Sequence, residues 1–273
     1  MLHADRNRGL TRAYTRAARR GPLRSQPEKN LACHATLNAN PVGWLDALDY
    51  GAGEGAVQTP VMKVGSATQA NAPQRPFYSK DSWSSDNGPA YNFIAVANMV
   101  WGCGTSIDIG GGRGCTIIAA CNFTATGTTG QIWEYTTAAT GANGAYIAFR
   151  RDGGVDHPFA VNGSFGVYSG GYLVGSYAGA DGVIVSAQDR SLGTQLLQVG
   201  GEWEGSGFNL ENGTGVVAGT YAAGASSWIG ARNNGASSPW GGKLRELIVC
   251  ATKLNADQLA SVVRSVRWRA RVL

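Results

Sequence analysis

The sequence has no long hydrophobic run and few charged residues. Charged residues make up 15% of the 273 positions, and no apolar stretch approaches the roughly 18–20 residues of a membrane-spanning helix. No apolar segment follows the N-terminal arginines, so neither a secretory nor a twin-arginine signal is recognisable. We therefore expect a soluble chain that does not associate with a membrane.

Patterns typical of metal sites and disulfide frameworks are also missing. The three histidines are scattered, and the spacings between Cys103, Cys115 and Cys121 match no zinc site. The cysteines number five, and an odd number without an export signal predicts free thiols. We predict no metal and no other cofactor.

Glycine and short apolar segments are abundant. The forty glycines follow no three-residue period, which excludes collagen and indicates many tight turns. Runs of β-branched and aromatic residues recur about every ten residues without intervening helical segments. This pattern predicts an all-β fold, a two-sheet antiparallel jelly-roll sandwich over residues 31–254. The strands are expected at 116–124, 131–137, 145–151, 165–169, 172–177, 183–188, 195–199, 216–221, 228–231 and 243–251.

The net charge of +5 is unevenly distributed. Residues 1–29 carry eight basic and two acidic side chains, a net charge of +6, whereas residues 30–260 are mildly acidic. We interpret residues 1–30 as a basic N-terminal arm. It can be a solvated tail, an anchor on an acidic protein or nucleic-acid surface, or an organelle presequence, and we favour the anchor. The docking residues would be Arg6, Arg8, Arg12, Arg16, Arg19, Arg20 and Arg24.

A helix is predicted at the C-terminal end, over residues 255–273. Asn255 and Gln258 have the spacing of a capping box. The helix should pack on the sandwich through an apolar face made by Leu259, Val262, Val263 and Val266. The arginines off that face are expected to be solvated, with a nucleic-acid contact as the alternative; they are Arg264, Arg267 and Arg271.

Five segments carry a family resemblance. They are residues 44–47 (WLDA), 75–78 (RPFY), 228–232 (WIGAR), 240–250 (WGGKLRELIVC) and 254–259 (LNADQL). These motifs resemble those of the concanavalin A-like, laminin-G-like jelly rolls found in many phage and bacterial surface proteins, although Cys250 stands where an aromatic residue is more usual. The resemblance spans roughly residues 41–268 and implies the same sandwich.

Glu246 is the most unusual residue of these motifs. Alternation along 242–249 places Leu244, Glu246 and Ile248 on one face, so the carboxylate is expected among apolar neighbours. Such a group is either a catalytic acid with a raised pKa or a structural acceptor. The resemblance favours the structural role.

The sequence offers little support for catalysis. Glu202 and Glu204 would share a strand face, as the paired carboxylates of retaining glycosidases do, but the third acid of that motif is missing. No Gly-x-Ser-x-Gly motif occurs. We therefore predict that the chain is not an enzyme, with glycoside hydrolysis as a weak alternative.

Aromatic residues in or beside glycine-rich loops could contact a glycan, or could equally be core or interface residues. These are Tyr168, Tyr172, Tyr177, Trp203 and Trp240.

The preferred functional hypothesis is a phage virion structural protein, assembled in the bacterial cytoplasm. It would be an accessory or decoration protein that docks through the basic arm on the major capsid protein or on tail proteins, beside neighbouring copies or as a homo-oligomer. The main alternative is a carbohydrate-binding adhesin of a tail fibre or cell surface, whose partners would be host surface glycans. Nucleic-acid packaging by the arm is a further alternative that the acidic body disfavours.

Overall fold

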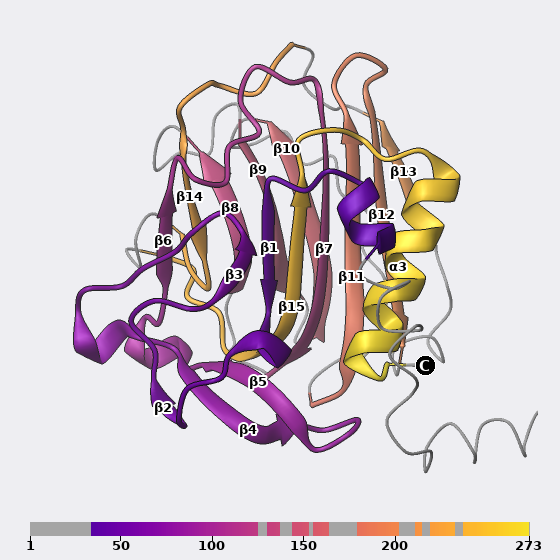
Figure 1. The fold of residues 1–273 in the computed structure, drawn as a ribbon. Coiled ribbons are helices and arrows are strands. Elements are labelled where there is room, and N and C mark those ends of the chain that lie inside the picture. Colours follow the sequence, from indigo (N-terminus) through magenta and orange to yellow (C-terminus); the bar gives the residue numbers. More distant parts are fainter. Residues whose placement is uncertain are drawn as a thin grey trace, which may run out of the picture.

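The computed structural model describes residues 34–124, 130–136, 144–152, 155–163, 179–201, 211–214, 219–232 and 237–272. These residues form two antiparallel β-sheets that face each other and a helix on the outside of one sheet (Figure 1). The predicted all-β sandwich with a C-terminal helix is therefore confirmed. The basic arm lies outside the described residues.

Sheet A, the larger sheet, has the order β13-β12-β11-β7-β15-β5-β4-β2, and β1 pairs with both β15 and β3. Its described strands are β1 (Gly43–Asp46), β2 (Gly55–Ala56), β3 (Met62–Val64), β4 (Phe77–Trp83), β5 (Gly88–Phe93), β7 (Gly114–Phe123), β11 (Asp181–Asp189), β12 (Thr194–Gly201), β13 (Glu211–Thr214) and β15 (Gly242–Cys250). The last strand, β15, lies in the middle of this sheet, between β7 and the strands β1 and β5.

Sheet B, the smaller sheet, has the order β10-β9-β8-β14-β6. Its described strands are β6 (Trp101–Gly104), β8 (Gly130–Thr136), β9 (Gly144–Asp152), β10 (Val155–Gly163) and β14 (Ser226–Ile229). Three short 3-10 helices occur in the connections: η1 (Ala47–Asp49), η2 (Ala72–Gln74) and η3 (Ala95–Ala97).

The main core lies between the sheets and contains a cluster of aromatic rings. Trp101 packs edge-on against Tyr91 and Phe93, with centroid distances of 4.9 and 5.4 Å. Trp240 extends the cluster, 5.1 Å from Phe93, and is fully buried. Edge-to-face packing of this kind adds to the stabilisation from area burial.

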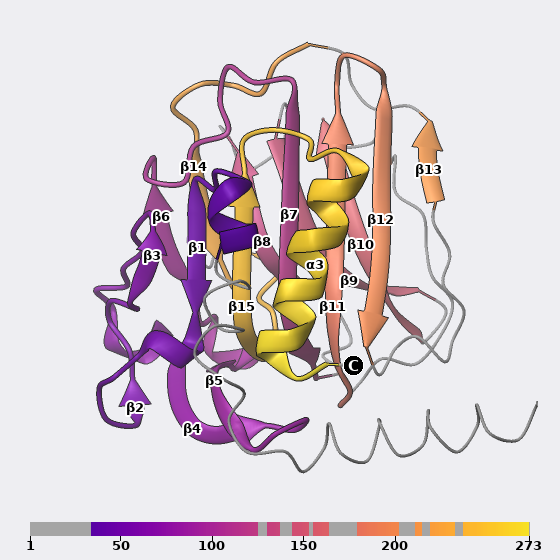
Figure 2. The same cartoon turned by 45° about the vertical axis from the view of Figure 1, so that its right-hand side comes forward.

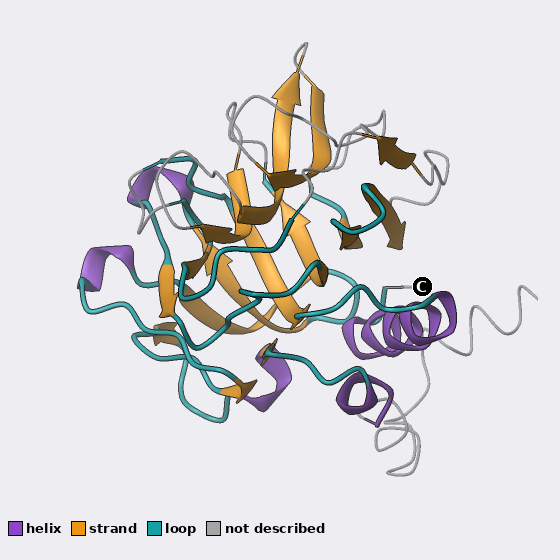
Figure 3. Ribbon diagram, turned by 90° about the horizontal axis from the view of Figure 1, so that it is seen from above, coloured by secondary structure: helices purple, strands orange, loops and turns teal. Residues whose placement is uncertain are grey.

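The helix α3 (Ala256–Ala270) covers the outer face of sheet A over β7, β11 and β15 (Figure 2). The predicted capping box is present, because the Asn255 side chain accepts from the Gln258 backbone at 2.9 Å and the Gln258 side chain accepts from the Asn255 backbone at 3.2 Å. Leu259, Val262 and Val266 are buried, as predicted. The view from above shows α3 outside the two layers of strands (Figure 3).

The structure contains more strands than were predicted. Strands β1 to β6, β10 and β13 were not among the predicted ranges. Among them, β4 contains several polar residues, and β10 contains Pro158, which cannot donate a ladder hydrogen bond. No strand is present at 219–221, and the segments expected at 165–169 and 172–177 lie outside the described residues.

Candidate functional site

Of the residues proposed as glycan or interface contacts, the structure describes only Trp240. Its ring belongs to the core between the sheets, so it offers no stacking surface to a ligand. Tyr168, Tyr172, Tyr177 and Trp203 lie outside the described residues, as do Glu202, Glu204 and the arginines Arg6, Arg8, Arg12, Arg16, Arg19, Arg20 and Arg24.

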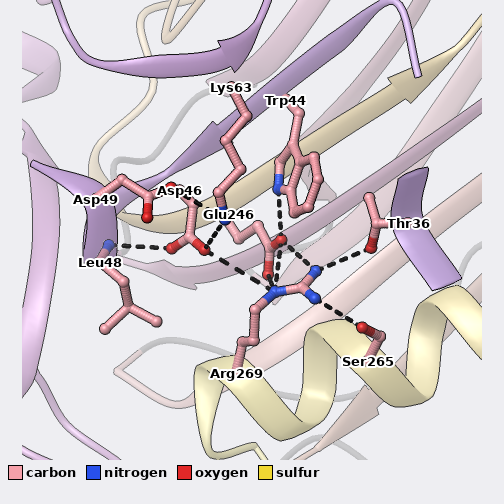
Figure 4. A network of polar contacts seen from close by, with 9 residues as sticks. All are labelled: Thr36, Trp44, Asp46, Leu48, Asp49, Lys63, Glu246, Ser265 and Arg269. Carbon is pink, nitrogen blue, oxygen red and sulfur yellow. Dashed lines mark hydrogen bonds and ion pairs between the residues drawn. The ribbon is translucent and has the colours of Figure 1, made fainter. Parts of the chain in front are cut away.

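The outer face of sheet A holds a buried polar network beneath α3 (Figure 4). The Glu246 carboxylate accepts from Trp44 Nε1 at 2.8 Å and from Arg269 Nε at 3.0 and 3.1 Å. Arg269 also donates to Ser265 Oγ at 2.6 Å and to Thr36 Oγ1 at 3.1 Å. Each of the three guanidinium nitrogens thus donates a hydrogen bond, and the bonds to Glu246 join the helix to the sheet.

Asp46 and Lys63 extend the network toward the surface. Lys63 Nζ lies 3.2 Å from Asp46 and 3.0 Å from Asp49. Burial alone would lower the pKa of Lys63, but the charges of the two carboxylates and the hydrogen bonds to them outweigh it, so the pKa is raised. Burial raises the pKa of Glu246, and the Arg269 guanidinium opposes that rise. Because each of these groups has a partner of opposite charge within the protein, the geometry supports the structural role for Glu246.

The prediction that Leu244 shares a face with Glu246 and Ile248 was wrong. A β-bulge between Leu244 and Glu246 shifts the register against β7, so Leu244 faces the core between the sheets while Glu246 and Ile248 face α3. Strict alternation cannot detect the extra residue of a bulge.

The outer face of sheet B carries a different constellation. The register places Trp228 of β14 opposite Glu134 of β8, and Glu134 opposite Tyr146 of β9. Since residues paired across antiparallel strands point to the same face, these side chains form a row of aromatic, carboxylate and aromatic groups. A separate apolar cluster on this face contains Tyr146 and Phe159.

Two further polar residues lie beside this row. Arg232, just after β14, donates from Nε to Glu134 Oε1 at 3.0 Å, and the two side chains are 7% and 1% exposed. Gln131 lies on the same face, because it pairs with Ala148 of that apolar cluster. We call Gln131, Glu134, Tyr146, Trp228 and Arg232 the sheet B site.

The chemistry of the sheet B site suits recognition of a polar ligand with apolar faces. Trp228 is only partly buried, so its indole can pack against a ligand, whereas the Glu134–Arg232 ion pair beside it is buried. A carboxylate, a guanidinium and an amide together supply acceptors and donors in fixed positions. Among the residues that the structure describes, no group of three or more His, Cys, Asp or Glu could hold a metal ion.

Only part of this site could be predicted from the sequence. Trp228 and Arg232 belong to the WIGAR motif, but Glu134 and Gln131 were not singled out. A carboxylate within the apolar strand 131–136 was the available signal. It was obscured by a bulge between Gln131 and Trp133, which places residues 132 and 133 on one face.

None of the described helices is long and apolar enough to cross a membrane.

The sequence matches no protein family and no curated protein. Solved structures with a similar fold include the enzymatically active domain of tailspike protein 2 from bacteriophage CBA120, with a TM-score of 0.56, 12% identity, and coverage of 84% of this chain and 33% of that one. An arabinofuranosidase bound to arabinofuranosyl-α-1,2-xylobiose has a TM-score of 0.52 and 11% identity, covering 88% and 65%.

Domain 4 of a GH43 extracellular arabinanase from Geobacillus stearothermophilus, in complex with arabinotriose, has a TM-score of 0.50 and 14% identity, covering 71% of this chain and 84% of that one. At such identities the likeness shows the fold alone. The chain spans only 33% of the tailspike structure and 65% of the arabinofuranosidase.

These structures correct one expectation. The prediction that the chain is not an enzyme is contradicted, because the proteins that share its fold include an arabinofuranosidase and a tailspike's enzymatically active domain. Missing sequence motifs were a poor ground for that exclusion, since catalytic groups are brought together by the fold rather than by spacing along the chain. A similar β-sandwich occurs in proteins whose structures hold saccharides, namely domain 4 of the arabinanase and the arabinofuranosidase.

Proposed function

We propose that the chain is a carbohydrate-binding β-sandwich and that the sheet B site holds the saccharide. The observation that carries this proposal is the row of Trp228, Glu134 and Tyr146 on three adjacent strands, with Arg232 paired to Glu134. A sugar ring has an apolar face for an aromatic side chain and hydroxyl groups that both donate and accept hydrogen bonds. The row offers a partner for each.

The solved structures with a similar fold support this proposal. Two of them hold saccharides, arabinotriose in one and an arabinofuranosyl-xylobiose in the other. The third is a bacteriophage tailspike domain, which supports placing the chain on a phage tail more than on a capsid. Within this proposal, the basic arm docks the sandwich on neighbouring virion proteins, and glycans of the host are the ligand.

A glycan array with the full chain tests the proposed binding. We expect saturable binding to at least one oligosaccharide, and a decrease of about tenfold or more in affinity for Trp228→Ala. Trp268→Ala is the matched control, because Trp268 is also partly buried but lies on α3, over the opposite sheet. No saturable binding to any glycan, or an equal loss in both variants, would contradict the proposal.

The arm is tested separately with purified particles from the source organism. Replacing Arg12, Arg16 and Arg19 with Glu should reduce incorporation of the chain while its sandwich stays folded. Incorporation at the level of the unchanged chain would contradict docking through the arm.

A further inference from the structure

We infer that the sheet B site takes an uncharged saccharide and that Gln131 accepts a hydrogen bond from one of its hydroxyl groups. This inference rests on the proposed function and narrows the class of ligand. Gln131 precedes Glu134 by three residues, a spacing that would place them on opposite faces of a regular strand. The bulge between Gln131 and Trp133 brings both side chains to the outer face, opposite Ala148 and Tyr146 respectively.

The side-chain oxygen of Gln131 is an acceptor without a donor. The residue is 1% exposed, and its Oε1 has no hydrogen-bond partner among the described residues. A buried polar atom is normally paired, because leaving it unpaired costs the hydration that it lost. A saccharide hydroxyl group that donates to Oε1 relieves this cost.

The charges of the site point to the same class of ligand. Glu134 and Arg232 compensate each other at 3.0 Å, and both are nearly excluded from water. A ligand carboxylate would lie near the Glu134 carboxylate, to which Arg232 Nε already donates. Repulsion between like charges is strong where water is excluded. An uncharged saccharide meets no such repulsion.

Trp228 is the partly exposed member of the row. Its neighbour on β6 is Gly102, whose backbone pairs with it. A Cβ atom at position 102 would lie 3.9 Å from the Trp228 ring, so the glycine leaves that edge of the indole free of a side chain. A sugar that stacks on Trp228 would direct its hydroxyl groups toward Glu134, the residue paired with Trp228 on β8.

The test compares neutral with uronate-containing and sialylated oligosaccharides on the same array, using the full chain. We expect every strong binder to be uncharged. Preferential binding of acidic glycans would overturn the inference and leave the proposed function standing, whereas no binding to any glycan would overturn both.

Two variants then test Gln131 on the best-binding neutral glycan. Gln131→Met removes the acceptor at similar volume and should weaken binding about tenfold, the loss expected for one hydrogen bond. Gln131→Asn keeps an amide acceptor without adding a charge and should bind the neutral glycan better than Gln131→Met does. Gln198→Met, on β12 of sheet A, is the control. Unchanged affinity of Gln131→Met, in a variant whose thermal unfolding matches that of the control, would overturn the role of Gln131.

Discussion

The guanidinium of Arg269, on α3, contacts both carboxylate oxygens of Glu246, on β15, through its Nε atom at 3.0 and 3.1 Å. Both residues are at least 95% buried. The C-terminal helix is therefore attached to the centre of sheet A by charge as well as by its apolar face. Removing one partner would leave the other as an uncompensated buried charge.

Arg269→Ala should accordingly lower the free energy of unfolding by about 3–5 kcal/mol. Arg264→Ala, at an exposed position of the same helix, should change it by less than about 0.5 kcal/mol. Urea unfolding followed by tryptophan fluorescence measures both values. Equal effects of the two substitutions would show that the contact with Glu246 contributes nothing specific.

A second buried arginine joins the two sheets. Arg190, after β11, donates to Asn162 Oδ1 of β10 at 2.7 Å, to the Gly144 carbonyl of β9 at 3.2 Å and to the Thr220 carbonyl at 2.9 Å. Arg190→Lys keeps the charge but cannot reproduce three divergent donors, so we expect a loss of at least about 2 kcal/mol in urea unfolding. Arg113→Lys, at an exposed position, is the control and should be neutral.

Gly230 of the WIGAR motif cannot accept a side chain. Its φ is +98°, and a Cβ atom there would lie 2.3 Å from Phe93 Cε1 and 2.9 Å from the Met99 carbonyl oxygen. Gly230→Ala should cost about 2–4 kcal/mol through strain and overpacking. Gly224 also has a positive φ but open space around it, so Gly224→Ala should cost about 1 kcal/mol. Similar midpoints of thermal unfolding for the two variants would contradict the steric explanation.

The four described cysteines are buried, and burial raises the pKa of Cys103, Cys115 and Cys250 to about 12 and that of Cys121 well above its ordinary value. Thiolates are the reactive form. The folded chain should therefore react at pH 8 with at most one equivalent of a thiol reagent, at Cys33, which lies outside the described residues. Five equivalents should react after unfolding in guanidinium chloride. Two or more fast equivalents in the folded chain would be inconsistent with this burial.

The same thiols predict how stability depends on pH. Above about pH 9 the unfolded chain releases thiol protons that the folded chain retains, and this favours unfolding. The free energy of unfolding should therefore fall as the pH rises from about 9 to about 12. Replacing Cys103 and Cys250 with Ala should reduce that slope in urea titrations at several pH values. An unchanged slope would assign the dependence to other groups.

The sequence predicted the parts of the fold that depend on local patterns. The capping box at Asn255 and the apolar spacing from Leu259 to Val266 located α3, and the β-branched runs located most of the long strands. Arg269 was missed as a buried residue, although it lies three positions after Val266 and so shares the apolar face. Its role becomes visible only with Glu246, 23 residues away, as its partner.

The sheet B site could not be predicted for a related reason. Its members come from β8, β9, β14 and the turn after β14, and only the strand order brings them together. The bulge in β8 then reverses the face on which Gln131 would be expected. Local sequence carries the tendency to form a strand, whereas register and bulges depend on pairing with strands far away in the chain.

The central place of β15 in sheet A has a consequence for synthesis of the protein. Synthesis of β7 is complete at Phe123, but β15, which pairs with one edge of β7, ends only at Cys250. At about 5–20 residues per second, the ribosome needs about 6–25 s to cover that interval. During this time the nascent chain exposes an unpaired, apolar strand edge, which is prone to intermolecular pairing. Yield in a heterologous host should therefore depend on chaperones that bind emerging chains.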